Sequence, residues 1–168
     1  MKWDKGIDYE YAYNKILRHL VKAKYPSLCY DAILLVQLRN GLRISEAIRT
    51  FKSYLQSKAL ELEVELSKKK KPEKRKAIIP MELLSINLAQ CYELISVDDK
   101  TLNKRLRVYC RLTYRFNTHS LRYSFISYLL RQGVNPSIIA KITRHSKLDF
   151  ILGYTQEKLA DDVLKSMG

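Results

Sequence analysis

The sequence lacks the features of membrane-spanning, secreted and disulfide-stabilised proteins. No apolar run approaches the roughly 20 residues that cross a bilayer. The N-terminus, MKWDKGIDYE, has no apolar stretch behind its charges, so it is not a secretory signal. The three cysteines, Cys29, Cys91 and Cys110, are scattered and form no CxxC pair. We therefore expect reduced thiols, no zinc site and a cytoplasmic location.

Acidic residues are scarce, and one long segment has none. Lys and Arg number 31 and Asp and Glu number 17, which leaves a net charge of +14. Between Lys104 and Lys147 there are ten basic residues and no acidic one, although apolar residues recur there at helical spacing. A folded surface with one sign of charge repels itself unless a counter-charge docks on it. This distribution favours a nucleic acid as the partner, ahead of an anionic membrane surface.

Length and composition indicate one globular domain. The chain has 168 residues, of which 46% are apolar and 29% are charged. This length allows one hydrophobic core and is short for two ordinary domains. No internal repeat or low-complexity linker interrupts the sequence.

Apolar periodicity predicts a mostly α fold, of the α+β class, with one small β-hairpin. Helices are expected at 9–24, 26–38, 45–55, 81–95, 98–112, 119–132, 136–144 and 147–153, with a tail helix from about 156. Residues 60–66 alternate leucine or valine with glutamate, which is typical of a strand. The basic segment 67–76 is expected to form the turn and 77–79 the return strand. Ser45 and Thr118 are expected to cap the helices that follow them.

Four local patterns carry residue types that suit a phosphate. In GLRISE, Arg43 precedes a helix start, where backbone N–H groups favour an anion, and an arginine can bind phosphate through two hydrogen bonds. In THSLR, His119 and Arg122 share one helix face and together suit an oxyanion. In RHSKLDFILGY, Tyr154 follows His145 by nine residues. The lysine-rich hairpin tip can direct one lysine into such a site as a general acid.

Each pattern alone also has an ordinary explanation. Arg43 could be a surface arginine before a capped helix, and the pair of His119 and Arg122 could lie on a solvated basic face. The helices at 119–132 and 136–144 could form the helix-turn-helix of a non-catalytic DNA-binding module. Such a module explains the charge, but it does not explain the order of the four patterns.

Taken in order, GLRISEA, the lysine-rich hairpin, THSLRYSFISYLL and RHSKLDFILGYT resemble the catalytic domain of the tyrosine recombinases, the phage-integrase family. The resemblance covers residues 26–156. It departs from the usual L-G-H motif at Arg144, which stands in place of the glycine before His145. The compact, lysine-rich chain looks like the integrases of archaeal viruses or plasmids.

The resemblance implies a set of catalytic residues. They are Arg43, Lys68, His119, Arg122, His145 and Tyr154. The two arginines and the first histidine would hold the scissile phosphate, and the second histidine would hydrogen-bond it. The tyrosine would attack to give a 3′-phosphotyrosyl link, and the lysine would protonate the departing 5′ oxygen. Residues 69–71 offer alternative lysines, and Glu46 would organise Arg43 or the helix start.

The resemblance also implies an enzyme without cofactors. Arginines carry the phosphate charge, so no metal is needed, and the enzyme–DNA ester stores the bond energy, so no ATP is needed. The implied partner is double-stranded DNA of the host, a virus or a plasmid, inside the cell and not at a membrane. The protein would form a homo-oligomer, a tetramer, on this DNA. A type IB topoisomerase uses related chemistry and is the enzymatic alternative.

The expected organisation is a single catalytic domain over residues 1–168. It would comprise an N-terminal helix in 1–25, the recombinase core in 26–156 and a C-terminal tail helix in 157–168. The family's N-terminal core-binding domain, which completes a clamp around DNA, is expected to be absent, because too few residues precede Arg43.

Overall fold

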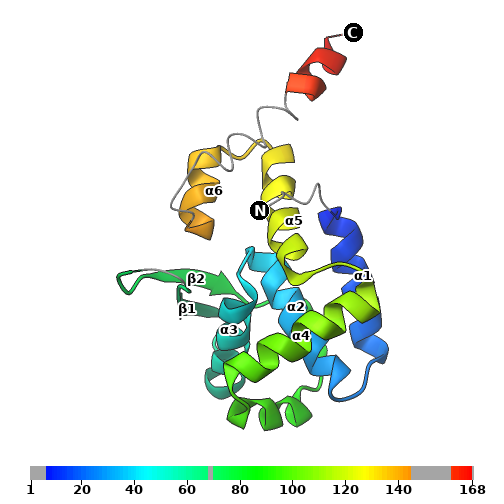
Figure 1. The fold of residues 1–168 in the computed structure, drawn as a ribbon, viewed down its shortest axis with the longest axis vertical. Coiled ribbons are helices and arrows are strands. Elements are labelled where there is room, and N and C mark those ends of the chain that lie inside the picture. The colour runs from blue at the N-terminus through cyan, green and yellow to red at the C-terminus, as the bar shows by residue number, and fades with distance from the viewer. Residues whose placement is uncertain (1–6, 68–69, 145–159, 168) are drawn as a thin grey trace.

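The computed structural model describes residues 7–67, 70–144 and 160–167. They form a mostly helical fold with one two-stranded antiparallel sheet (Figure 1). This confirms the predicted fold class. Within these ranges, no helix is long and apolar enough to cross a membrane.

The elements follow the predicted order closely. They are α1 Tyr9–Lys22, α2 Ser27–Asn40, α3 Ile44–Ser57, β1 Glu61–Glu65, β2 Lys74–Ile78, the 3-10 helices η1 Met81–Ser85 and η2 Ala89–Ser96, α4 Asp99–Tyr114, α5 Thr118–Arg131 and α6 Pro136–Thr143. Residues 160–166 are also helical, as expected for the tail. The helix predicted at 147–153 lies outside the described residues.

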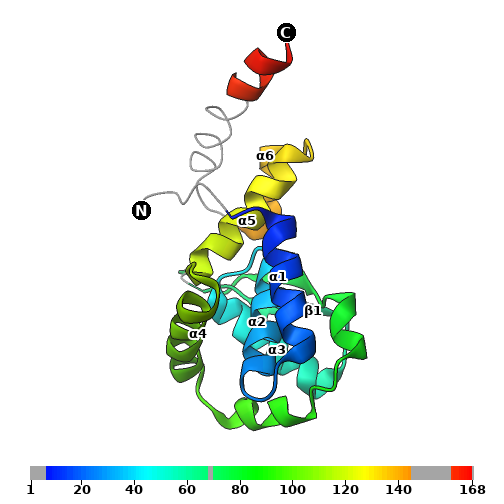
Figure 2. The same ribbon diagram turned by 90° about the vertical axis from the view of Figure 1, so that its right-hand side faces the viewer.

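Helix α2 is the centre of the fold because its side chains are buried around its whole circumference. Every residue from 29 to 38 is buried. Helices α1, α3 and α5 pack around it (Figures 1 and 2). A helix that is apolar on all sides belongs in a core. The end of α2 is therefore held in place by the surrounding helices, and residues of the candidate site contact it.

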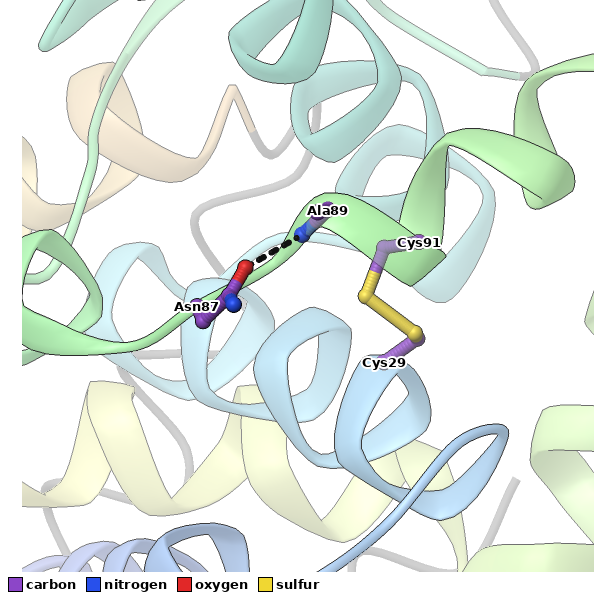
Figure 3. The surroundings of a disulfide bond; sticks show 4 residues. All are labelled: Cys29, Asn87, Ala89 and Cys91. Atoms are coloured by element: carbon purple, nitrogen blue, oxygen red, sulfur yellow. Dashed lines mark hydrogen bonds between the residues drawn. A yellow bond between two sulfur atoms is a disulfide. The ribbon is translucent and has the colours of Figure 1, made fainter.

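The segment predicted as one helix at 81–95 forms η1 and η2 instead. The backbone between them is extended at Ile86, with φ −102° and ψ 136°. The Asn87 side chain then accepts a hydrogen bond from the backbone N–H of Ala89 (3.0 Å; Figure 3). Asparagine competes for backbone groups in this way, which favours turns over helix interiors. Apolar spacing alone did not reveal this interruption.

Strands β1 and β2 form the predicted hairpin, but β2 begins earlier than predicted. Val64 pairs with Arg75, and Glu65 pairs with Lys74. Basic residues assigned to the turn therefore belong to the strand. Arg75 lies on the buried face together with Ala77, two residues further on. Its burial is explained by main-chain partners described below.

A disulfide joins Cys29 and Cys91, so the prediction of reduced thiols is wrong for this pair (Figure 3). The bond links the first turn of α2 to η2, and the two Cα atoms are 5.6 Å apart, which is a usual disulfide spacing. The cysteines are 62 residues apart in sequence, so only the fold brings them together. Cys110 is a buried free thiol, and burial raises its pKa to about 12.

Reduction of this disulfide should destabilise the protein strongly. In the loop-entropy model, opening a closed loop spanning 62 residues lowers the free energy of unfolding by about 4 kcal/mol. Denaturant unfolding with and without a reductant checks this, and reduction should bring the parent to the level of Cys29→Ser. Cys110→Ala is the control, because it should keep the response to the reductant. A parent that ignores the reductant and titrates with three free thiols would contradict the disulfide.

Candidate functional site

Arg43 occupies the N-cap position of α3. Its backbone N–H donates to Glu46 Oε1 (3.1 Å), and its Nη1 donates to Glu46 Oε2 (3.1 Å). Glu46 is fully buried, whereas 23% of the Arg43 side chain is exposed. Arg43 is therefore fixed by a carboxylate and still reachable from solvent. Ser45, predicted as the cap, lies inside the helix instead, because Arg43 and Glu46 satisfy the helix start between them.

Ser67 ties the end of the first hairpin strand to the same carboxylate. Its backbone N–H donates to Glu46 Oε2 (3.0 Å), and its Oγ lies 2.6 Å from Ser45 Oγ. Arg49 Nη2 donates to Ser67 Oγ (2.9 Å) and to the carbonyl of Glu65 (2.7 Å). The chain immediately before Lys68 is thus anchored beside Arg43. Lys68 itself lies outside the described residues.

Arg122 is buried where α5 crosses the end of α2. Its Nη1 donates to the carbonyl of Gly41 (2.8 Å), and its Nη2 donates to the carbonyl of Thr143 at the end of α6 (3.1 Å). The same Nη1 is 4.0 Å from Glu46 Oε1. Glu46 therefore lies between Arg43 and Arg122, and the structure brings these two predicted residues together.

Gly41 makes this approach possible. It ends α2 in the left-handed conformation, with φ 62°, which glycine adopts readily at a helix end. A Cβ atom at this position would clash with the ring of Phe125 on α5. Only glycine lets the end of α2 lie this close to α5, so Gly41 sets the spacing between Arg43 and Arg122.

His119 lies in the first turn of α5 and is half-buried. Its position three residues before Arg122 places the two on one helix face, as predicted. The cap of α5 is Asn117 rather than Thr118, because the Asn117 side chain accepts from the backbone N–H of Ser120 (2.9 Å). Gln37 Nε2 donates to the Thr118 carbonyl (2.9 Å) and so fixes this helix start to α2.

Arg43, Arg122 and Arg75 form an arginine cluster, and the sequence patterns missed Arg75. Its Nη2 donates to the carbonyl of Asn40 (2.5 Å), and its Nη1 lies 3.5 Å from the carbonyl of Gly41. Burial lowers the pKa of Arg75 to about 10. A period-two count back from the buried Ala77 would have placed Arg75 on the inner face. The basic run around it indicated a solvated turn instead.

The site carries more positive than negative charge. Burial is the main reason that the pKa of Arg122 falls to about 9, and the nearby cations Arg43 and Arg75 lower it further. The positive charge of Arg144, at the end of α6, also lowers the pKa of Arg75. Among the residues described around Arg122, Glu46 is the carboxylate that opposes these cations. A bound oxyanion would therefore be stabilised by several preorganised donors.

Three predicted site residues, Lys68, His145 and Tyr154, cannot be placed beside these arginines. His145 and Tyr154 lie outside the described residues, as do Lys68 and Lys69, whereas Lys70 is exposed. In the ranges given above, no group of three or more His, Cys, Asp or Glu side chains is arranged to hold a metal ion. The described part of the site is thus the arginine cluster with Glu46 and His119.

The sequence is similar to those of viral and archaeal proteins. Residues 9–160 match the sequence model of the Phage integrase family. The chain is 41% identical over 170 residues to "Putative integrase ORF241" of Acidianus two-tailed virus, a match that covers 98% of this chain and 68% of that protein. It is 31% identical over 198 residues to the uncharacterized protein MJ0770 of Methanocaldococcus jannaschii, covering 99% of this chain and 89% of that protein.

The fold is similar to those of solved recombinases. The XerH site-specific recombinase, bound to its difH substrate before cleavage, matches with a TM-score of 0.60 and 17% identity, over 95% of this chain and 52% of that chain. The XerA recombinase matches with a TM-score of 0.59 and 17% identity, over 100% of this chain and 66% of that chain. The chain thus spans about half of the XerH chain and just under two thirds of the XerA chain. At such identities the likeness concerns the fold alone.

Proposed function

This chain belongs to the phage integrase family, and on that premise we propose that it is a site-specific DNA recombinase acting through a 3′-phosphotyrosyl intermediate. The observation that carries the proposal is the convergence of Arg43 and Arg122 on one buried carboxylate, Glu46. Two arginines from separate helices, with excess positive charge around them, suit one phosphate group.

Arg43 and Arg122 would bind the non-bridging oxygens of the scissile phosphate. Arg122 is held by carbonyl groups and Arg43 by Glu46, so little reorganisation is needed when the phosphate enters. His119, on the face of α5 that carries Arg122, would donate a further hydrogen bond, and His145 would donate another. The extra negative charge of the pentavalent transition state is then shared among fixed donors.

Tyr154 would supply the nucleophile and Lys68 the general acid. The tyrosine oxygen gives its proton to solvent and forms a bond to phosphorus, and the bond from phosphorus to the 5′ oxygen breaks. Lys68 gives its proton to that 5′ oxygen. The anchoring of Ser67, the residue before Lys68, to Glu46 and Arg49 supports this role. The reverse reaction with another 5′ hydroxyl completes strand exchange.

The exposed face of α4 is the described surface best suited to the DNA backbone. It presents basic residues at helical spacing, namely Lys104, Arg107 and Arg111. None of them forms an ion pair with a residue in the described ranges. Helix α4 leads directly into the loop before α5 (Figure 1). A duplex bound along this face would therefore approach the start of α5, which carries His119.

The double variant Arg107→Gln/Arg111→Gln should bind DNA more weakly and with less salt dependence. Each lost phosphate contact should make the slope of log affinity against log salt shallower by about 0.9. Fluorescence anisotropy over a salt series measures this. Arg18→Gln/Lys22→Gln is the matched control, since it removes the same charge from the exposed face of α1. Equal changes in the two double variants would exclude α4 as the main contact surface.

Trapping on nicked duplexes tests the proposed function. The duplexes carry a random sequence around the nick, so that a target sequence is present among them. After cleavage next to the nick, the released strand is short and diffuses away, so the covalent complex accumulates. We expect a protein–DNA adduct on a denaturing gel, linked to the 3′ end, and the trapped DNA gives the target sequence. Binding without an adduct would favour the non-catalytic module. Relaxation of supercoiled plasmid without exchange between duplexes would favour a topoisomerase.

A further inference from the structure

We propose that Arg75 is a positioning residue, which holds the end of α2 and thereby orients Arg122 toward the scissile phosphate. This inference deepens the proposed function and rests on it. The sequence patterns assign no role to Arg75 and place it in the hairpin turn. Its place in the structure suggests an indirect contribution to cleavage, since its partners are main-chain groups.

Arg75 and Arg122 reach the same carbonyl oxygen from different elements. Arg122 Nη1 donates to Gly41 O from α5 (2.8 Å), and Arg75 Nη1 approaches it from β2 (3.5 Å). Arg75 Nη2 donates to Asn40 O as well (2.5 Å). Helix α2 ends here, so these carbonyl groups need partners from outside the helix. The orientation of the Gly41 carbonyl, and hence of Arg122, depends on Arg75.

Asn40 fastens the strand that carries Arg75. Its Oδ1 accepts from the backbone N–H of Ile78 (2.7 Å), and its Nδ2 donates to the Ile78 carbonyl (2.8 Å). Strand β2 is therefore attached to the end of α2 at two points. Arg75 is also fixed in register opposite Val64. Its guanidinium is thus placed by the sheet and the helix together.

The charge of Arg75 favours a phosphate in the site. Its hydrogen bonds within the described chain go to main-chain carbonyl groups, so no carboxylate pairs directly with it. Burial lowers its pKa, and Arg144 and Arg43 do so further, against the opposing effect of Glu46. Burying a second cation beside Arg122 costs free energy when no phosphate is bound. A phosphate bound between the arginines would offset that cost.

The first experiment compares Arg75→Met and Arg75→Lys with Lys76→Met. Lys76 lies on the exposed face of the same strand and pairs with Glu61 (3.2 Å), so its loss removes equal charge without touching α2. Single-turnover cleavage of a nicked duplex should slow by about 10- to 100-fold in Arg75→Met, because a small misplacement of a catalytic group costs up to about 10²-fold. Arg75→Lys should lose less, and Lys76→Met least. Equal rates in Arg75→Met and Lys76→Met would overturn the inference.

A double-mutant cycle separates positioning from general destabilisation. If Arg75 acts through Arg122, adding Arg75→Met to Arg122→Lys should slow cleavage little further. The same change added to Lys68→Ala should multiply the two losses. Multiplied losses in both combinations would overturn the inference, since Arg75 would then act independently of Arg122.

The orientation of Arg122 can also be followed without cleavage. In protein labelled with ¹⁵N-arginine, the Nε–H signal of Arg122 is assigned from the spectrum of Arg122→Lys. Arg75→Met should shift or broaden this signal, and Lys76→Met should leave it in place. An unmoved signal in folded Arg75→Met would overturn the positioning role. If Arg75→Met shifts the Arg122 signal but the parent never forms a DNA adduct, the recombinase proposal is refuted. The effect of Arg75 on the orientation of Arg122 would still be supported.

Discussion

Tyr154→Phe should bind DNA as tightly as the parent and form no covalent adduct. The substitution removes the nucleophilic oxygen and leaves the arginine cluster and the basic face of α4 intact. Anisotropy measures the binding, and a denaturing gel of the complex with a nicked duplex measures the adduct. This is the largest effect we expect from any single substitution, because the chemistry has no second route.

Several other tyrosines are poor candidates for the nucleophile. Burial raises the pKa of Tyr9 to about 12. Burial also raises the pKa of Tyr13, Tyr109 and Tyr114, and each of these hydroxyl groups donates to a carboxylate. A phenol with a raised pKa loses its proton less readily at neutral pH and is a weaker nucleophile. These hydroxyl groups hold the fold together instead.

Tyr123→Phe is the matched control for Tyr154→Phe. Tyr123 follows Arg122 directly in α5, so it is a stringent alternative nucleophile. Tyr123→Phe should form the adduct. An adduct that persists in Tyr154→Phe and disappears in Tyr123→Phe would show that the nucleophile is misassigned.

Arg43→Ala and Arg122→Ala should each slow cleavage by about 10²- to 10³-fold, because each removes one preorganised oxyanion donor. Their effects on stability should differ. Arg122 satisfies the buried carbonyl groups of Gly41 and Thr143, so its loss should also lower the free energy of unfolding, by about 1–3 kcal/mol. Arg43 is partly exposed and should cost less stability. Single-turnover cleavage and denaturant unfolding measure the two effects.

Arg39→Ala is the control for these two variants. Arg39 lies in the last turn of α2, is partly exposed and forms no hydrogen bond or ion pair with any residue that the structure describes. Its removal takes away one positive charge near the site and leaves the contacts of Arg43 and Arg122 in place, so most of the cleavage rate should remain. If Arg43→Ala cleaved as fast as Arg39→Ala, Arg43 would have no part in holding the phosphate.

The local settings of Arg43 and Arg122 follow from short-range signals in the sequence, whereas their convergence is implied only by the resemblance to the tyrosine recombinases. Gly41 predicts the end of one helix, Glu46 three residues after Arg43 predicts a carboxylate at the next helix start, and the spacing of His119 and Arg122 predicts a shared face. These signals act within one or two helical turns, so they can be recognised without the fold. The identity of the cap, Arg43 rather than Ser45, depended on how Glu46 is oriented.

The sequence could not predict contacts that depend on chain packing. Cys29 and Cys91 meet only because η2 packs near the start of α2. Arg75 looked like one more base in a lysine-rich turn, and its burial follows from the carbonyl groups that the end of α2 presents to β2. Both features join segments far apart in sequence, where neither periodicity nor capping rules apply.

Identifying the amino acid that carries the DNA tests the recombinase proposal directly. The parent is trapped on a nicked duplex, the complex is digested with nuclease and protease, and the nucleotide-bearing peptides are sequenced by mass spectrometry. We expect a single modified peptide, with the 3′ phosphate of the DNA on Tyr154. A nucleotide on any other of the 12 tyrosines, a link to a 5′ end, or DNA binding with no modified peptide at all would contradict this expectation.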